Sequence, residues 1–174
     1  VQDRLFESDN TLKYSPMMMG MFGDRMFLNG MPREQTDVAK CPHRIRILNA
    51  SNARFYKLAW NDGSPLEIIG TDGGLLERPI NRNYFYLTPG ERIDLWKDFS
   101  SYYLDTEIKL VSLPFQEGRD KQYDVIPFKV KSLPTRSNSL PSYLSQFESL
   151  DPTQANNYGA AKKFTFSMNK QFFT

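Results

Sequence analysis

The feature that most constrains the fold of this chain is a series of short runs, between residues 40 and 131, in which apolar and polar residues alternate. In the run His43–Leu48, Ile45 and Ile47 point to one face of a strand, and the arginines beside them point to the other. Gly, Pro, Asn or Asp residues separate the runs, and these residues favour tight turns. The pattern predicts an all-β chain, folded as an antiparallel Greek-key sandwich or barrel.

At least seven strands are expected, in the segments 43–48, 54–60, 66–70, 83–87, 92–96, 107–111 and 123–130. Tyr56, Leu58 and Trp60 share one face of the second segment, which predicts a buried face. The first two strands are expected to be neighbours, joined by the turn Asn49–Asn52. Pro127 removes a hydrogen-bond donor from the last strand, which predicts an edge or a bulge there.

The chain divides into three parts by composition. Residues 1–131 form the predicted sandwich. Residues 132–161 contain Pro and Ser and are sparse in apolar residues, which indicates a linker and an extended surface segment, with one short helical turn expected near 143–147. Residues 162–174 are interpreted as the first strand of a following domain. Since the chain opens without Met or a signal-peptide pattern, we interpret it as processed or as part of a longer chain.

Charge and residue counts exclude several classes of function. The 174 residues include 22 Lys and Arg against 20 Asp and Glu, a net charge of +2, so neither nucleic acid nor a membrane surface is an expected partner. The chain has one Cys and one His, Cys41 and His43. These two cannot form an internal disulfide, a zinc finger or a site with several imidazoles. We interpret them as a strand-entry Cys and a surface His.

A cluster of methionines is the one candidate metal site. Thioethers are soft ligands, so a Cu(I) contact through Met17, Met18, Met19 and Met21 is one hypothesis. Met also fills irregular gaps, and we favour packing of this loop against another surface, because contiguity alone does not close a metal site.

Charged side chains beside the strands suggest ion pairs. Arg44, Arg46, Arg54, Arg92 and Asp94 could form an anion site, but the balanced charge of the chain favours cross-strand ion pairs. The sequence Asp-Gly-Gly at residues 72–74 lacks the context of a phosphate-binding loop and is interpreted as a turn.

Aromatic side chains suggest a weaker alternative. Tyr84, Tyr86, Tyr102 and Tyr103 could serve an adhesion or carbohydrate-binding sandwich. Alternating aromatic residues more often pack than bind, so we rank this hypothesis last.

Three motifs, in order, resemble the middle (second) cupredoxin domain of three-domain multicopper oxidases, a group that includes bacterial laccases, the spore-coat laccase and bilirubin oxidases. They are Arg44–Leu58, Ile69–Glu77 and Leu87–Asp94. The resemblance covers roughly residues 1–131, and Phe164–Met168 resembles the first strand of the third domain.

The resemblance implies a scaffold without copper. The family oxidises phenols, bilirubin-like tetrapyrroles or metal ions at one copper and reduces dioxygen at a cluster of three others. Its ligands occur as His-x-His pairs and a His-Cys-His run in the first and third domains, and this chain has neither motif. We therefore expect no catalytic residue, cofactor or metal site here, copper in the parent oxidase, and flanking cupredoxin domains as partners. The alternative is a free-standing β-sandwich that binds Cu(I) through the Met-rich loop.

Overall fold

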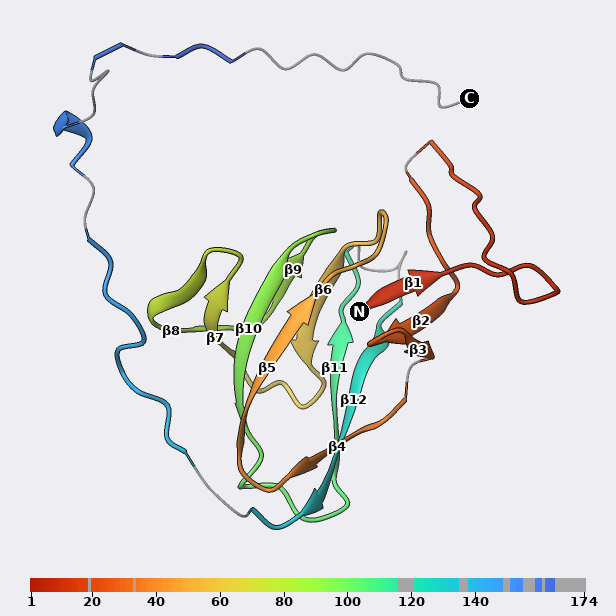
Figure 1. Cartoon of the computed structure of the whole chain (residues 1–174). Coiled ribbons are helices and arrows are strands. Elements are labelled where there is room, and N and C mark those ends of the chain that lie inside the picture. Colours follow the sequence, from red (N-terminus) through yellow and green to blue (C-terminus); the bar gives the residue numbers. More distant parts are fainter. Residues whose placement is uncertain are drawn as a thin grey trace.

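Two packed β-sheets form the body of the protein, and a small third sheet lies at one end (Figure 1). The computed structural model describes residues 1–18, 20–32, 34–115, 121–134, 138–148, 151–154, 159–160 and 162–164. All strand pairs in these residues are antiparallel except one. This architecture confirms the predicted all-β sandwich.

The first sheet has four strands in the order β5-β10-β7-β8. They are β5 (Pro42–Leu48), β10 (Arg92–Asp98), β7 (Leu66–Thr71) and β8 (Gly74–Arg82). β7 and β8 form a hairpin in which Thr71 lies opposite Gly74. The predicted Asp-Gly-Gly turn is thereby confirmed, with Gly74 at a positive φ of 113° that favours glycine.

The second sheet has five strands in the order β4-β12-β11-β6-β9. They are β4 (Thr36–Ala39), β12 (Tyr123–Ser132), β11 (Glu107–Ser112), β6 (Tyr56–Trp60) and β9 (Phe85–Leu87). β4 is parallel to β12, and this pairing begins at Phe128. Pro127 lies just before that residue, in register opposite Lys109 of β11, and the bulge of the β11–β12 pairing lies at Val125 and not at the proline.

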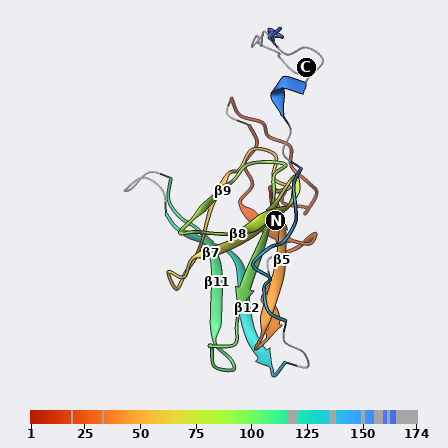
Figure 2. The ribbon, with the colours of Figure 1, turned by 90° about the vertical axis from the view of Figure 1, so that its left-hand side faces the viewer.

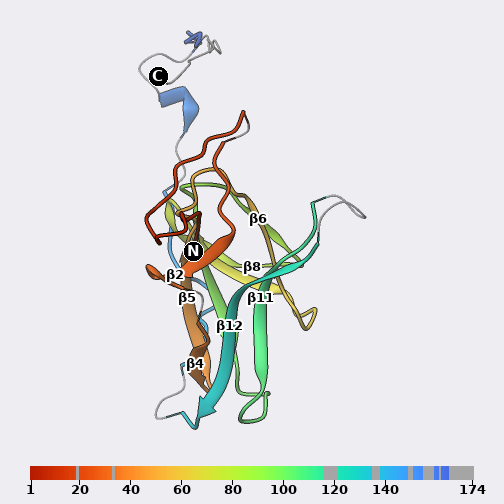
Figure 3. The same ribbon diagram turned by 90° about the vertical axis from the view of Figure 1, so that its right-hand side faces the viewer.

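The small sheet contains β1 (Gln2–Arg4), β2 (Arg25–Leu28) and β3 (Met31–Pro32). The two turned views show it at one end of the sandwich, close to β5 (Figures 2 and 3). The N-terminal amine donates a hydrogen bond of 2.7 Å to the carbonyl of Leu48, at the end of β5, so backbone contacts attach this sheet to the body.

Apolar side chains from both large sheets meet in one core. The predicted face of β6 is confirmed, since Tyr56, Leu58 and Trp60 are 0 %, 0 % and 3 % exposed. Trp60 packs against Phe99 and Phe128, with ring centroids 6.3 Å and 5.7 Å away. Removal of this apolar area from water, about 25 cal/mol per Å², is the main force that holds the sheets together.

The expected pairing of the first two strands was wrong. β5 and β6 belong to different sheets, so residues 49–55 cross from one sheet to the other instead of closing a hairpin. Asn49 stabilises this crossing, because its buried side chain donates hydrogen bonds to the carbonyls of Arg54 and Leu87, 2.8 and 3.0 Å away. An alternating pattern identifies a strand but does not show which strand lies beside it.

The segment after β12 is extended where it is described. The helical turn expected at 143–147 was wrong, and a 3₁₀ helix lies at Pro152–Gln154 instead. The predicted strand at 162–174 lies outside the described residues except for 162–164, which are not in a strand. No helix among the described residues is long and apolar enough to cross a membrane.

Candidate functional site

The Met-rich segment forms a tight turn on the surface. Met17 and Gly20 exchange backbone hydrogen bonds of 3.0 and 2.9 Å. Met17 and Met18 are 63 % and 102 % exposed, whereas Met21 is buried and its sulfur accepts a hydrogen bond of 3.7 Å from Asn52. Met19 lies outside the described residues. Met21 thus packs against the body, and the two exposed thioethers project into solvent.

Gly20 fixes how closely this turn approaches the sandwich. A Cβ built on Gly20 would lie 2.4 Å from the Cβ of Ala53, and the residue has a φ of 104°. Any side chain there would push the turn away from the crossing between β5 and β6.

Cys41 and His43 lie together at the start of β5. The His43 Nδ1 atom is 2.8 Å from the Cys41 carbonyl and 4.0 Å from the Cys41 sulfur, and the imidazole packs edge-on against Phe99. Within the described part of the chain, no group of three or more His, Cys, Asp or Glu side chains could hold a metal ion.

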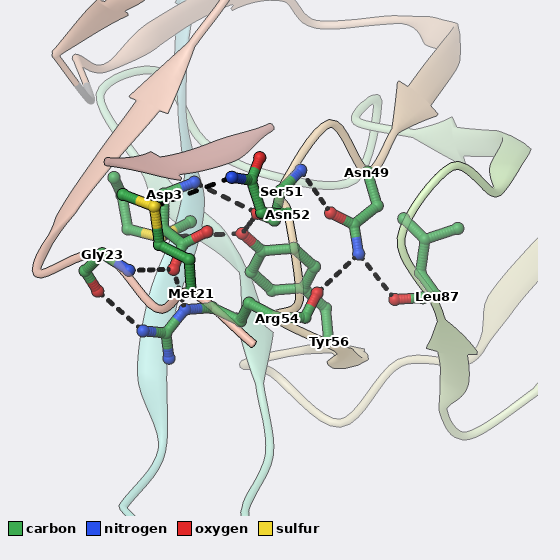
Figure 4. A network of polar contacts seen from close by, with 10 residues as sticks. Asp3, Met21, Gly23, Asn49, Ser51, Asn52, Arg54, Tyr56 and Leu87 are labelled. Carbon is green, nitrogen blue, oxygen red and sulfur yellow. Dashed lines mark hydrogen bonds and ion pairs between the residues drawn. The ribbon is translucent and has the colours of Figure 1, made fainter. Parts of the chain in front are cut away.

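A buried polar network joins the small sheet to the body (Figure 4). The carboxylate of Asp3 in β1 is 1 % exposed, and its Oδ2 atom accepts hydrogen bonds from Arg54 Nε at 2.7 Å and from the Gly23 amide at 2.6 Å. Arg54 also donates to the Gly23 carbonyl at 2.7 Å. One ion pair therefore connects β1, the loop before β2 and the crossing between the large sheets.

Ser51 and Tyr56 extend this network into the core. Ser51 Oγ accepts a hydrogen bond from the Asp3 amide at 3.1 Å and lies 2.7 Å from the Tyr56 hydroxyl. Burial raises the pKa of Tyr56 far above its ordinary value. The phenol therefore stays neutral and serves as a hydrogen-bonding group.

A groove with a volume of ≈ 820 Å³ opens beside Arg54. Its lining comes from five separate segments and comprises Phe22, Asn52, Ala53, Arg54, Phe55, Pro89, Leu113, Phe115, Lys121 and Tyr123. Ligand pockets commonly have volumes of about 300–1,000 Å³ and mostly apolar walls, so this groove is the main candidate site of the chain. Periodicity did not predict it, because its residues are not close together in the sequence.

Exposed aromatic side chains continue from the groove onto β9. Phe115 stacks on Tyr86 with centroids 5.6 Å apart, and Tyr86 contacts Tyr84 at 5.4 Å. The ammonium of Lys57 lies 4.7 Å from the centre of the Tyr84 ring, a cation–π geometry. This surface is suited to flat apolar or aromatic partners.

The tyrosines considered for carbohydrate binding form two separate groups. Tyr84 and Tyr86 lie with Lys57 near one end of β6, whereas Tyr102 contacts Lys97, which lies over Trp60 at the other end. Tyr103 is 82 % exposed.

Lys97 is the one lysine among the buried residues that the structure describes. Its ammonium donates to Ser64 Oγ at 2.6 Å and to the Tyr102 hydroxyl at 2.8 Å, and it lies 3.7 Å from the Asp62 carboxylate. Burial lowers the pKa of Lys97, an effect that Asp62 and Asp98 oppose. Burial and the Asp62 carboxylate raise the pKa of Tyr102 to about 12. These contacts tie the β6–β7 turn to the loop after β10.

Three of the four arginines predicted to form ion pairs, Arg44, Arg54 and Arg92, do so, and in separate places. Arg44 pairs with Asp94 across β5 and β10, as expected. Arg92 pairs with Asp72 at 3.1 Å, on the surface. Arg54 contacts Asp3 in a different sheet, so the set is not one cross-strand network.

No protein-family model matches the chain. The curated relatives include the cell division protein FtsP of Escherichia coli strain K12, which is 37% identical over 102 residues, 58% of this chain and 22% of the relative. FtsP of Xenorhabdus nematophila is 40% identical over 101 residues, 58% of this chain and 21% of the relative. A laccase of Bacillus stratosphericus is 34% identical over 117 residues, 59% of this chain and 23% of the laccase. The chain thus spans about a fifth of the length of these relatives.

The similar solved structures are multicopper oxidases and laccases. The McoA multicopper oxidase of Aquifex aeolicus matches with a TM-score of 0.80 and 36% identity, over 88% of this chain and 35% of that one. A laccase of Pediococcus acidilactici matches with a TM-score of 0.73 and 33% identity, over 86% of this chain and 31% of that one. The predicted resemblance to a cupredoxin domain of the multicopper oxidases is thereby confirmed, together with the cupredoxin-like fold.

Replacing Asp3 with Asn should lower the free energy of unfolding by about 3 kcal/mol, because it leaves the Arg54 guanidinium without its buried counter-ion. Urea unfolding measures the change. Asp72→Asn is the matched control: it breaks the solvent-exposed pair with Arg92 and should destabilise the chain much less than Asp3→Asn does. Equal losses in the two variants would contradict a special role for the buried pair.

Replacing Lys97 with Met should change how stability depends on pH. Because the pKa of Lys97 is lower in the folded chain than in the unfolded one, the unfolded chain binds more protons between the two values, and stability rises with pH across that window. The variant lacks this rise. The difference in unfolding free energy between the original chain and Lys97→Met should therefore shift in favour of the original from pH 7 to pH 10.

Above about pH 10 the raised pKa of Tyr102 makes the stability of the folded chain fall as the pH rises. The two chains are therefore compared only up to pH 10. Lys109→Met, at a half-exposed lysine that pairs with Asp124, reports the general effect of losing a lysine. A Lys97→Met profile parallel to that of the original chain would refute the prediction.

Replacing Met17, Met18, Met19 and Met21 together with Leu should leave the Cu(I) affinity of the chain unchanged, because Met21 packs against the body and Met17 and Met18 point into solvent. Competition with a Cu(I) chelator measures the affinity. A tenfold or greater loss would show instead that the Met-rich turn binds Cu(I).

Proposed function

We propose that this chain is the middle, copper-free scaffold domain of a laccase-like multicopper oxidase. The observation that carries the proposal is the match of 88% of the chain to 35% of the McoA multicopper oxidase. In this proposal residues 1–131 form the domain, residues 132–161 form the linker, and residues 162–174 begin the next domain. The flanking cupredoxin domains are its partners.

The donor atoms of the chain support a structural role. Reduction of dioxygen by four electrons at several coppers requires many nitrogen and sulfur ligands, and this chain has one His and one Cys. His43 and Cys41 contact each other and Phe99 at the start of β5. The copper of the parent is therefore assigned to other parts of the protein.

The groove beside Arg54 supports a second part of the proposal. Phe55 and Phe115 are 50 % and 43 % exposed, and such apolar surface marks contact sites when it is continuous. In the intact oxidase this side would contact a flanking domain or form part of the substrate cleft. The substrates implied by the resemblance are phenols, tetrapyrroles or metal ions, with dioxygen reduced to water.

A second candidate is a domain of a cell division protein. It is favoured by the FtsP relatives, which are 37% and 40% identical to this chain over 58% of its length. The copper content of the intact protein separates the two candidates. An intact protein that binds copper and consumes oxygen supports the oxidase, and one that does neither favours the division protein.

The chain alone, mixed with copper and a phenol, should consume no oxygen above a control with copper only. An oxygen electrode measures the rate, and the intact parent oxidase serves as the positive control. Sustained turnover by the chain alone would disprove the scaffold role, because it would require a redox-active metal centre formed within these residues.

A further inference from the structure

β8 is an edge strand of the four-stranded sheet. It is nine residues long and pairs with β7 on one side only. Edge strands expose backbone N–H and C=O groups that can pair with another extended chain, and proteins commonly cover or interrupt them. The outer edge of β8 is an edge of this kind.

Residues 138–148, which we call the strap, run beside β8 (Figures 1 and 2). The amide of Leu144 donates a hydrogen bond of 2.9 Å to the carbonyl of Glu77. The hydroxyl of Ser145 lies 3.1 Å from the carbonyl of Leu76 and 3.3 Å from that of Leu75. One amide and one hydroxyl of the strap thus approach three consecutive carbonyls of β8, where the pairing of β8 with β7 shifts register between Leu75 and Ile80.

Arg78 and Tyr143 add a side-chain contact next to these backbone bonds. The guanidinium carbon of Arg78 lies 4.0 Å from the centre of the Tyr143 ring, and Arg78 also donates to the Tyr143 hydroxyl. Planar guanidinium groups stack well on aromatic rings. Arg78 therefore favours tyrosine over most other residues at position 143.

Pro79 interrupts the row of backbone donors along this edge. It lies two residues beyond Glu77 and has no N–H to offer to a neighbouring strand. The strap therefore covers part of β8 before the proline, and residues 80–82 after it are exposed.

We propose that the outer edge of β8, from Leu75 to Arg78, is a docking site for an extended segment, and that its ligand is the strap of the same chain. Carbonyls of β8 supply the backbone contacts, and Arg78 recognises Tyr143. One main-chain hydrogen bond, the Ser145 hydroxyl and the Arg78–Tyr143 contact together hold the strap, and side-chain contacts of this kind give specificity to the recognition of extended segments. The domain itself thereby fixes the path of the linker, whatever the function of the parent protein.

Amide hydrogen exchange of Leu144 in the 174-residue chain tests the proposal with variants of the strap and with a variant of β8. Tyr143→Ala combined with Ser145→Ala weakens the strap, and Arg78→Ala weakens the strand. Each change should speed exchange of the Leu144 amide at least tenfold. Phe147→Ala is the matched control, since this residue of the strap is 64 % exposed, and it should leave the exchange rate unchanged.

Amides of β6 and β10 provide the check on folding and should keep their protection in all three variants. If the Leu144 amide of the original chain exchanges as fast as in an unstructured peptide, the strap does not bind β8 and the proposal fails. It also fails if the Arg78→Ala and Phe147→Ala variants have the same effect.

Discussion

Burial of one face of β6 is the constraint on which the rest of the structure depends. Tyr56, Leu58 and Trp60 enter the core from the second sheet, and β10 of the first sheet contributes Ile93 and Leu95 opposite them. Each of these side chains is less than 5 % exposed. Because the faces of both sheets are apolar, neither sheet is stable alone, and the loops take the positions that this packing leaves them.

Polar groups decide the details that apolar burial leaves open. The Asp3–Arg54 pair determines where the small sheet attaches, and Gly23 must be a glycine there, because a Cβ would lie 2.3 Å from the Arg4 amide nitrogen. At the opposite end of β6, Lys97 holds two loops together. Both clusters combine charge with hydrogen bonds, as groups with little access to water require.

The sequence could predict strands with one clear apolar face, and the face of β6 is the best example. It could not predict that β5 and β6 belong to different sheets, because one of the two Asn49 hydrogen bonds that stabilise the crossing goes to Leu87, 38 residues away. β8 was missed since its side chains are mostly exposed and Pro79 interrupts the pattern. The sequence predicted neither the groove nor the Asp3–Arg54 ion pair, because both are formed by residues that are far apart in the chain. Asp3 lies 51 residues from Arg54, and a periodic pattern links only residues that are close in sequence.

The few contacts of the strap should yield to mechanical load before the sandwich does. Its contacts with β8 involve neighbouring residues at the outer edge of the sheet, so tension on the linker would break them one after another. The strands of the core are instead held by many bonds that must break together. The strap would therefore release at low force and lengthen the tether, while the sandwich behind it stays intact.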